Sequence, residues 1–399
     1  MARTVCHIIT KLELGGAQQN TLFTVGHLDR TRFRPVLITG EPGLLDAEAR
    51  ALAGVEFHQI PHLIREIRPW SDLRALLSLY RRLRQIKPAI VHTHSSKAGI
   101  LGRLASWMAG VPIIVHSIHG FGFTSYQSPL QRRVLTTAEK LVARLTAAFI
   151  AVSEANRRVG IELGLFAEEQ CRVIRSGVDL KAIERTRIDR RKKVLELGLD
   201  PDRPVVGMIA ALKPQKAPLD FVRVAGRLHR THPHVQFLLV GDGALRQAVE
   251  REIQALYLGG SFHMVGWRRD VMEIMRCLDV CMLTSLWEGL PRVYVEAVAS
   301  RVPVVGTNVD GAAEVIRDGV NGFLVEPGDI ASLVSRVQDL LTDGTLAQRM
   351  RERAASLPLE FDIHEMVRRQ EREYDRLLDA FTMACPLSAP SQYGTQSRH

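Results

Sequence analysis

The stretch SLWEGLPRVYVE, residues 285–296, combines three structural signals in a short space. It directly follows an apolar run at 280–284, which is typical of a buried parallel strand. Gly289 permits a tight turn, and Pro291 suits the first helical position because an N–H there would have no partner in the helix. The sequence therefore predicts a strand, a turn and a helix over this stretch.

Two carboxylates flank the predicted helix start. Glu288 precedes the helix, and Glu296 lies about 7–8 Å further along it at roughly 1.5 Å per residue. A helix start binds anions, and carboxylates accept hydrogen bonds from hydroxyls, so the spacing suits a nucleotide sugar. The residues expected around the phosphates are Gly289, Leu290, Pro291, Arg292 and Val293. The alternative is a capped helix with surface acids, and the strand–turn–helix context favours the ligand site.

Outward from this stretch, short β-branched runs alternate with amphipathic helical patterns. The runs expected as strands are 5–9, 35–39, 90–93, 113–117 and 148–152, followed by 205–210, 235–240, 280–284, 304–306 and 323–325. Helical spacing over 71–86, stopped by Pro88, illustrates the segments between them. A charge-rich segment at 181–203 separates the two series, so the sequence predicts two doubly wound α/β domains in tandem.

Length and composition set further bounds. A chain of 399 residues exceeds one hydrophobic core, and 46% hydrophobic and 24% charged residues are ordinary for a globular protein. The five cysteines lack zinc spacing, so we expect buried thiols in a reducing compartment. The N-terminus lacks the apolar length of a signal peptide, and no run approaches the roughly 20 apolar residues of a membrane span. We expect a cytoplasmic protein, either soluble or on the inner membrane surface.

The 285–296 stretch resembles the Glu-x7-Glu motif of glycosyltransferase family 4. The resemblance continues in register through 297–307, 311–316 and 319–325, and extends over nearly the whole chain. It implies the α/β GT-B fold, in which two Rossmann-like doubly wound parallel-sheet domains face each other across a cleft. The expected parts are an acceptor-side domain at 1–183, a donor domain at 184–359, a helix at 360–385 packing back on the first domain, and a disordered tail at 386–399.

The resemblance also implies the chemistry. A sugar moves from a nucleoside-diphosphate sugar to a hydroxyl of a glycan or lipid-linked glycan, in cell-envelope or exopolysaccharide synthesis, with retention of anomeric configuration and without metal or cofactor. Glu288 is assigned to the donor sugar and Glu296 to the nucleotide ribose. Two alternatives stay open: a nucleotide-sugar epimerase of the same fold, and a non-catalytic membrane adaptor that binds a sugar nucleotide.

Cationic residues follow the first strand of the second series. Lys216 suits a catalytic role there, because a lysine neutralises a departing pyrophosphate as a point charge. The family usually has arginine at the position of Ala211 and glycine at that of Ala217, so this chain departs from the pattern. Lys213 is the candidate to replace the missing charge; the alternative for both lysines is a solvated loop.

Glycine-rich turns after other strands complete the expected donor site. Gly15 and Gly16 follow the first strand, where glycine lets backbone approach phosphate or sugar, although a plain turn is equally consistent with the pair alone. Gly241 and Gly243 resemble the family turn beside the nucleotide. Trp267 is expected either to stack on the base or to join the core.

Three histidines end strands of the first series. His119 is expected to be catalytic and to face the donor sugar, as the family commonly has histidine there. His92 and His94 lie on one side of their strand, so a metal pair is conceivable, but the sequence presents no third ligand. We favour acceptor-side or structural roles for both.

Basic residues gather in one predicted helix and the segment before it. They are Arg65, Arg68, Arg74, Arg81, Arg82 and Arg84. A basic amphipathic helix binds anionic lipid, which would place the protein peripherally on a membrane; a solvated helix face is the alternative. The net charge of +10 attracts polyanions, but no nucleic-acid-binding motif accompanies it, so we expect no nucleic-acid partner.

Overall fold

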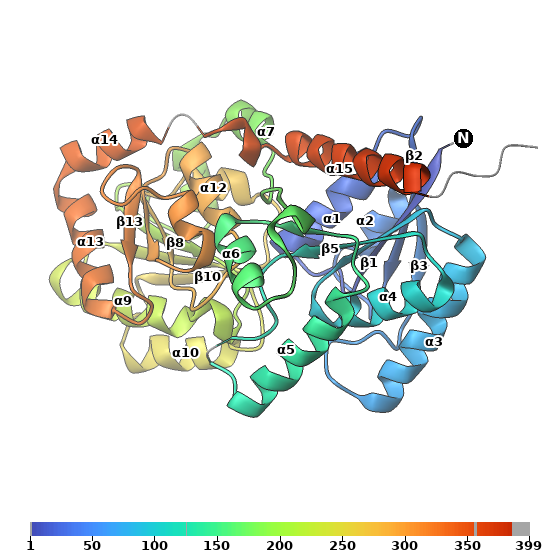
Figure 1. Cartoon of the computed structure of the whole chain (residues 1–399). Helices are drawn as coiled ribbons and strands as arrows, with labels where there is room; N and C mark the ends of the chain where they lie inside the picture. The colour runs from blue at the N-terminus through green and yellow to red at the C-terminus, as the bar shows by residue number, and fades with distance from the viewer. Residues whose placement is uncertain (1, 125, 355–356, 385–399) are drawn as a thin grey trace, which may run out of the picture.

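The computed structural model describes residues 2–124, 126–354 and 357–384 and contains two parallel β-sheets (Figure 1). The first sheet has seven strands in the order β3-β2-β1-β4-β5-β6-β7. They are β1 (Arg3–Ile9), β2 (Phe33–Thr39), β3 (Glu56–Gln59), β4 (Ile90–His94), β5 (Ile113–Ile118), β6 (Ala148–Ala151) and β7 (Cys171–Val173). Its helices are α1 (Gly16–His27), α2 (Asp46–Ala51), α3 (Pro69–Ile86), α4 (Ser96–Ala109), α5 (Pro129–Ala143) and α6 (Glu154–Glu162), with the 3₁₀ turn η1 (Glu168–Gln170).

The second sheet has six strands in the order β10-β9-β8-β11-β12-β13. They are β8 (Val205–Ile209), β9 (Gln236–Val240), β10 (Phe262–Gly266), β11 (Val280–Leu283), β12 (Val304–Thr307) and β13 (Gly322–Val325). Its helices are α7 (Leu180–Arg185), α8 (Arg190–Glu196), α9 (Pro218–Thr231), α10 (Arg246–Ala255), α11 (Val271–Met275), α12 (Arg292–Ala299), α13 (Ile330–Thr342) and α14 (Gly344–Arg353). The 3₁₀ turns are η2 (Pro214–Lys216), η3 (Asp310–Glu314) and η4 (Leu359–Phe361).

The predicted pair of doubly wound parallel sheets is confirmed. All ten predicted strands are present, with bounds within two residues of the expected ones. The three strands that the sequence did not reveal are β3, β7 and β10, and each lies at the edge of its sheet. An edge strand is covered on fewer sides, so its residues carry a weaker apolar signal: all four residues of β3 and four of the five in β10 are only half-buried.

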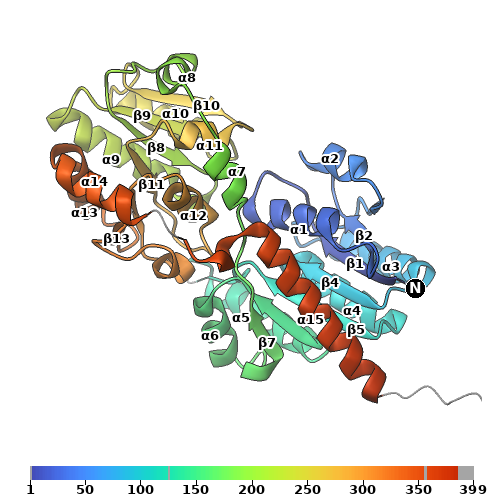
Figure 2. The ribbon, with the colours of Figure 1, turned by 90° about the horizontal axis from the view of Figure 1, so that it is seen from above.

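Helix α15 (Ile363–Ala384) packs on the first domain rather than the second, as Figure 2 shows. Tyr374 is fully buried there and makes an edge-to-face contact with Phe33 of β2. The backbone N–H of Asp29 donates to Glu371 at 2.7 Å, which ties α15 to the loop after α1. The tail expected to be disordered, 386–399, lies outside the described residues.

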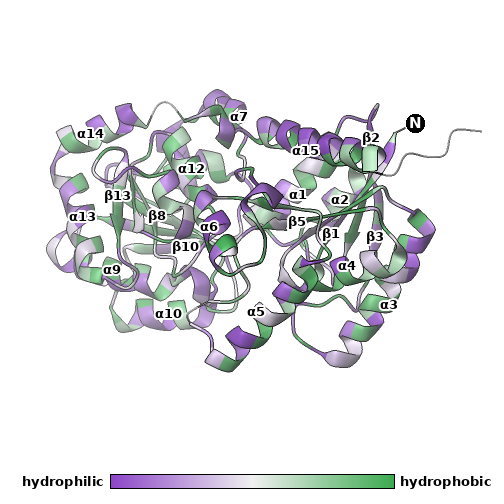
Figure 3. Cartoon of the chain, in the orientation of Figure 1, coloured by the Kyte–Doolittle hydropathy of each residue, from purple (hydrophilic) through white to green (hydrophobic). Residues whose placement is uncertain are grey.

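The strands are the most apolar part of both domains (Figure 3). Cys6, Cys171, Cys277 and Cys281 are buried free thiols, as predicted, and burial raises the pKa of Cys281 to about 12. Cys385 lies outside the described residues. Within those residues, no helix combines the length and apolar character that a membrane crossing requires.

Candidate active site

The predicted strand–turn–helix unit is β11, a loop and α12. Pro291 is the N-cap residue and Arg292 begins the helix, so the proline lies one position earlier than predicted. The side chain of Leu290 is buried and that of Val293 packs against the core of the second domain. What these two residues present to a ligand is therefore the backbone at the helix start, which attracts anions.

Glu288 is held by contacts from three directions. Its carboxylate pairs with the Lys216 ammonium and accepts a hydrogen bond from Ser285 Oγ at 2.6 Å. Its backbone N–H donates to Asp310 Oδ2 at 2.6 Å. The carboxylate is thus oriented before any ligand binds, and Lys216 lies directly beside it.

Glu296 and Arg292 form a buried pair one turn into α12, with Arg292 Nη2 and Glu296 Oε1 3.4 Å apart. Burial raises the pKa of Glu296, and the positive charges of Arg292 and Lys216 oppose that shift. Arg292 also reaches the first domain, where it donates to Gln19 Oε1 at 2.7 Å. The guanidinium therefore links the carboxylate to the start of α1.

The backbones of the two domains touch beside these side chains. A Cβ added to Gly289 would lie 2.4 Å from the carbonyl oxygen of His119, and one added to Gly120 would lie 3.2 Å from that of Glu288. A Cβ on Gly16 would meet the Arg292 side chain at 2.9 Å. Glycine at these positions is what allows the loops to approach so closely. The structure thus brings the Gly15–Gly16 turn, His119 and the α12 start together.

Lys213 lies near Lys216, in the loop after β8. Burial, with repulsion from Lys216 and Arg65, lowers the pKa of Lys213 to about 8. Arg65 belongs to the first domain and was predicted as part of a membrane surface, yet it lies close enough to Lys213 to repel it. Positive charge therefore gathers in this region even though Ala211 replaces the usual arginine.

The loop after β8 keeps a backbone that suits glycine, although Ala217 stands where the family has one. Ala217 has φ of 42° and ψ of 53°, the left-handed conformation. Gly241 and Gly243 pack on the same loop: added Cβ atoms would lie 2.0 Å from the carbonyl oxygen of Ala210 and 2.6 Å from that of Leu212. Both glycines are thus required by packing, whatever they contribute to a ligand.

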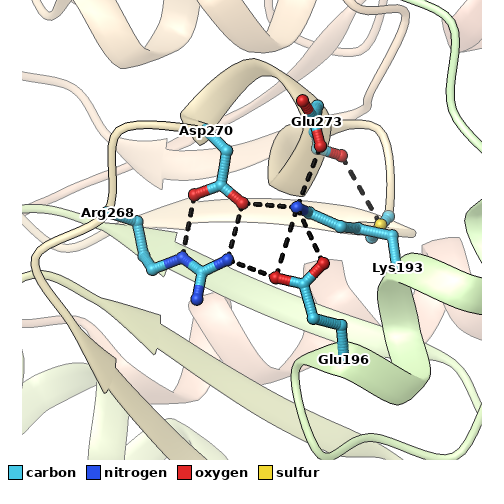
Figure 4. Close-up of polar contacts among 6 residues, drawn as sticks. Lys193, Glu196, Arg268, Asp270 and Glu273 are labelled. Carbon is cyan, nitrogen blue, oxygen red and sulfur yellow. Dashed lines mark hydrogen bonds and ion pairs between the residues drawn. The ribbon is translucent and has the colours of Figure 1, made fainter.

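Trp267 follows β10 and is 39% exposed, so it is not a core residue. The chain beyond it is fixed by an ion-pair network with α8 (Figure 4). Lys193 Nζ lies 2.5 Å from Asp270 Oδ2, and Arg268 forms ion pairs with both Asp270 and Glu196. The network anchors the loop while leaving the indole accessible.

The histidines that end the strands of the first sheet lie together. His94 Nδ1 is 3.0 Å from His119 Nε2, and His7 Nδ1 is 3.0 Å from His94 Nε2. The expectation that no third imidazole accompanies His92 and His94 is wrong: ligand atoms of His7, His92 and His94 all lie within 4.8 Å of one another. His7 joins them because it pairs with His92 in the parallel register of β1 and β4, which the spacing of residues along the chain does not indicate.

The sequence did not indicate three residues of this site, Gln19, Ser285 and Asp310, and it indicated a membrane surface for Arg65. Gln19 and Asp310 act through partners distant in sequence, Arg292 and the backbone of Glu288. Ser285 is the exception, because it lies only three residues before Glu288 at a strand end, where its hydroxyl was a natural candidate.

Two family models match this chain. The model Glycosyltransferase Family 4 matches residues 14–182, and the model Glycosyl transferases group 1 matches residues 189–357. The two matched segments correspond to the two sheets. The class that the fold and the α12 site define is therefore a glycosyltransferase.

The chain belongs to glycosyltransferase family 4. It is 33% identical over 351 residues to the UDP-Gal:alpha-D-GlcNAc-diphosphoundecaprenol alpha-1,3-galactosyltransferase of Escherichia coli, which covers 86% of this chain and 89% of the relative. It is also 26% identical over 319 residues to the N,N'-diacetylbacillosaminyl-diphospho-undecaprenol alpha-1,3-N-acetylgalactosaminyltransferase of Campylobacter jejuni, covering 78% and 83% of the two chains.

Solved structures confirm the GT-B fold. Anabaena Alr3699/HepE, determined with UDP and glucose, superposes with a TM-score of 0.80 at 22% identity, covering 94% of this chain and all of the other. WaaG, a glycosyltransferase involved in lipopolysaccharide biosynthesis, gives a TM-score of 0.73 at 14% identity, covering 96% of this chain.

Proposed function

We propose that this glycosyltransferase moves a sugar from a UDP-sugar to a hydroxyl of a glycan carried on a polyprenyl diphosphate, in cell-envelope or exopolysaccharide synthesis. The support comes from its relatives. The Escherichia coli enzyme is named for UDP-Gal and for an acceptor linked to diphosphoundecaprenol, and the Campylobacter jejuni enzyme for another acceptor of that kind.

The observation that carries the proposal is the arrangement of charge around the start of α12. Glu288, oriented by Lys216 and Ser285, takes the hydroxyls of the donor sugar. Glu296 takes the ribose, and the pyrophosphate lies at the helix start near Lys216 and Arg292. Negative charge grows on the departing UDP, so fixed positive groups there stabilise the transition state more than the bound substrate.

The proposed reaction retains the anomeric configuration and uses no metal or cofactor. Lys213, Lys216 and Arg292 supply positive charge of the kind that a divalent cation gives a departing pyrophosphate. In this scheme His119, at the end of β5, faces the donor sugar from the first domain.

We also propose peripheral attachment to an anionic membrane through the first domain. Helices α3 and α5 both pack against α4 (Figure 1). Both helices also carry exposed apolar side chains. Trp70 is 80% and Leu130 is 73% exposed, and Arg68 and Arg74 are exposed beside the former. Apolar side chains next to arginines suit the headgroup region of a bilayer, where the lipid-linked acceptor resides.

The test is transfer from a panel of UDP-sugars and GDP-sugars to a synthetic GlcNAc-diphosphoundecaprenol acceptor in the presence of EDTA. We expect a UDP-sugar to react, and the product to keep the donor anomeric configuration by NMR. Glu288→Ala should lower kcat/KM by about 100-fold or more, while Glu169→Ala, which removes an exposed carboxylate in η1, should not. Unchanged transfer by Glu288→Ala would show that the site is assigned wrongly, and loss of activity in EDTA would disprove metal independence.

A further inference from the structure

A continuous chain of hydrogen bonds runs through the first domain between α15 and His119. Its members, in order, are Ser117, His92, Tyr374, His7, His94 and His119. The successive distances are 2.7, 2.5, 3.3, 3.0 and 3.0 Å. Five members come from strand positions or strand ends of the first sheet, and Tyr374 comes from α15.

The imidazoles of this chain are neutral at physiological pH. Burial lowers the pKa of His119 to about 4 and that of His7 to about 3, and holds the pKa values of His92 and His94 well below the usual range. A neutral imidazole has one N–H donor and one acceptor nitrogen. Each inner histidine must therefore donate to one neighbour and accept from the other.

The Tyr374 hydroxyl has a single proton, so it can donate to His7 or to His92 but not to both. That choice fixes which nitrogen donates in every other bond of the chain. If Tyr374 donates to His7, then His7 donates to His94, His94 donates to His119, and Nδ1 of His119 carries the remaining proton. If Tyr374 donates to His92, every bond reverses, His119 donates through Nε2, and its Nδ1 becomes an acceptor. Only these two directions satisfy every bond and also use the proton of the Tyr374 hydroxyl, and they differ in what His119 presents at Nδ1.

The geometry favours the second direction. The contact of the Tyr374 hydroxyl with His92 Nδ1 is 2.5 Å and that with His7 Nε2 is 3.3 Å, and an O–H donor makes the shorter bond. Among the described residues, His119 Nδ1 is buried without a hydrogen-bond partner. A buried acceptor without a partner costs free energy until a ligand supplies a donor.

We propose that Tyr374, His7 and His94 are positioning residues that hold His119 in one tautomer, with Nδ1 as the acceptor for a hydroxyl of the donor sugar. This inference rests on the proposed role of His119 at the donor. It gives α15 a part in the reaction: the helix supplies the hydroxyl that sets the direction of the whole chain. Ser117 and His119, the two ends of the chain, line one cavity with Gln370 of α15.

A metal ion is the competing explanation for three clustered histidines. Ligand atoms of His7, His92 and His94 lie within 4.8 Å of one another, a span that one ion can bridge. The two arrangements exclude each other, because an ion would occupy the nitrogen lone pairs that the hydrogen bonds use. Metal content therefore tests the proposal directly.

The experiment compares the wild-type protein with Tyr374→Phe, which removes the hydroxyl and keeps the ring. With histidines labelled by ¹⁵N, the wild type should show His119 Nδ1 as the unprotonated nitrogen, and the variant should show both tautomers of His119. Transfer should fall about three- to tenfold in kcat/KM for the donor, the effect of one hydrogen bond. The affinity for UDP should be unchanged, because UDP lacks the transferred sugar whose hydroxyl His119 would contact. Leu377→Ala, one turn further along α15 in the same core, should lower the melting temperature and leave the tautomers alone.

The outcomes distinguish a failure of the hydrogen-bonded chain from a failure of the proposed contact between His119 and the donor sugar. Stoichiometric zinc in the purified wild type, or a His119 tautomer unaffected by Tyr374→Phe, would overturn the hydrogen-bonded chain. A changed tautomer with unchanged transfer would uphold the chain and overturn the contact between His119 and the donor sugar. Equal losses of transfer in Tyr374→Phe and Leu377→Ala would show that α15 acts only through stability.

Discussion

Substituting Gly289 with alanine tests whether sugar transfer takes place with the two domains in contact at Gly289 and His119. The added Cβ would lie 2.4 Å from the carbonyl oxygen of His119, 2.6 Å from its carbon and 2.9 Å from the backbone nitrogen of Gly120. All three atoms are backbone of the other domain, so no side-chain rotation relieves the contact. An ordinary contact needs about 3.4 Å or more, so the domains must separate locally by about 1 Å.

The expected size of the effect follows from that overlap. Forcing an extra methyl into a packed site costs roughly 1–3 kcal/mol. At about 1.4 kcal/mol for each factor of ten, the arrangement in which the backbones of the two domains touch becomes about five- to 150-fold less populated. The loss should appear in kcat/KM for the donor, because Glu288 and His119 then lie too far apart to hold one sugar. The melting temperature should change little, since each domain has its own core.

Donor-dependent transfer and small-angle X-ray scattering with and without UDP would measure this. Gly344→Ala is the matched control, because a Cβ there has no atom within 4 Å and its backbone is not left-handed. We expect Gly289→Ala to show weak transfer and less compaction with UDP, and Gly344→Ala to behave as wild type. Transfer by Gly289→Ala within twofold of wild type would refute the idea that this contact belongs to the reactive form.

Three further predictions follow from other features. UDP affinity measured by calorimetry should fall as the pH rises through about 8, because the lowered pKa of Lys213 makes it lose its charge there; Lys213→Met should remove that dependence, and a persisting slope would contradict it. Ala217→Gly should raise the free energy of unfolding in urea by up to about 1 kcal/mol, since relief of a left-handed alanine outweighs the added unfolded-state entropy; a loss of stability would contradict this. Arg68→Ala and Arg74→Ala should each weaken sedimentation with anionic vesicles about fivefold and leave neutral vesicles unaffected, whereas binding that ignores lipid charge would exclude the arginines as the cause.

The sequence was sufficient to predict the fold because buried parallel strands appear in it as short, continuous apolar runs. Every residue of Val304–Thr307 and Gln236–Val240 is buried, and all of them except Gln236 and Thr307 are apolar or glycine. Cys171–Val173 could not be recognised, because at a sheet edge three residues with an exposed arginine have no period to detect.

The sequence predicted the site residues that lie within one short segment. It did not predict those that meet only through the pairing of strands or the packing of distant helices. Glu288 and Glu296 follow from one strand–turn–helix unit. Tyr374 and His7 meet only because parallel pairing and the return of α15 bring them together, and no spacing along the chain encodes that. Arg65 likewise influences the pKa of Lys213 only because the two domains approach each other.

The docking of α15 on the first sheet also dictates an order of events during synthesis. The core of the first domain contains Phe33 and Ile150 together with Tyr374, so it stays incomplete until α15 has left the ribosome. At roughly 5–20 residues per second, the delay after β7 is on the order of 10–40 s. The second domain is contiguous and finishes earlier, so the first domain to be translated is the last to mature. During that interval the side of the first sheet that α15 covers lies uncovered.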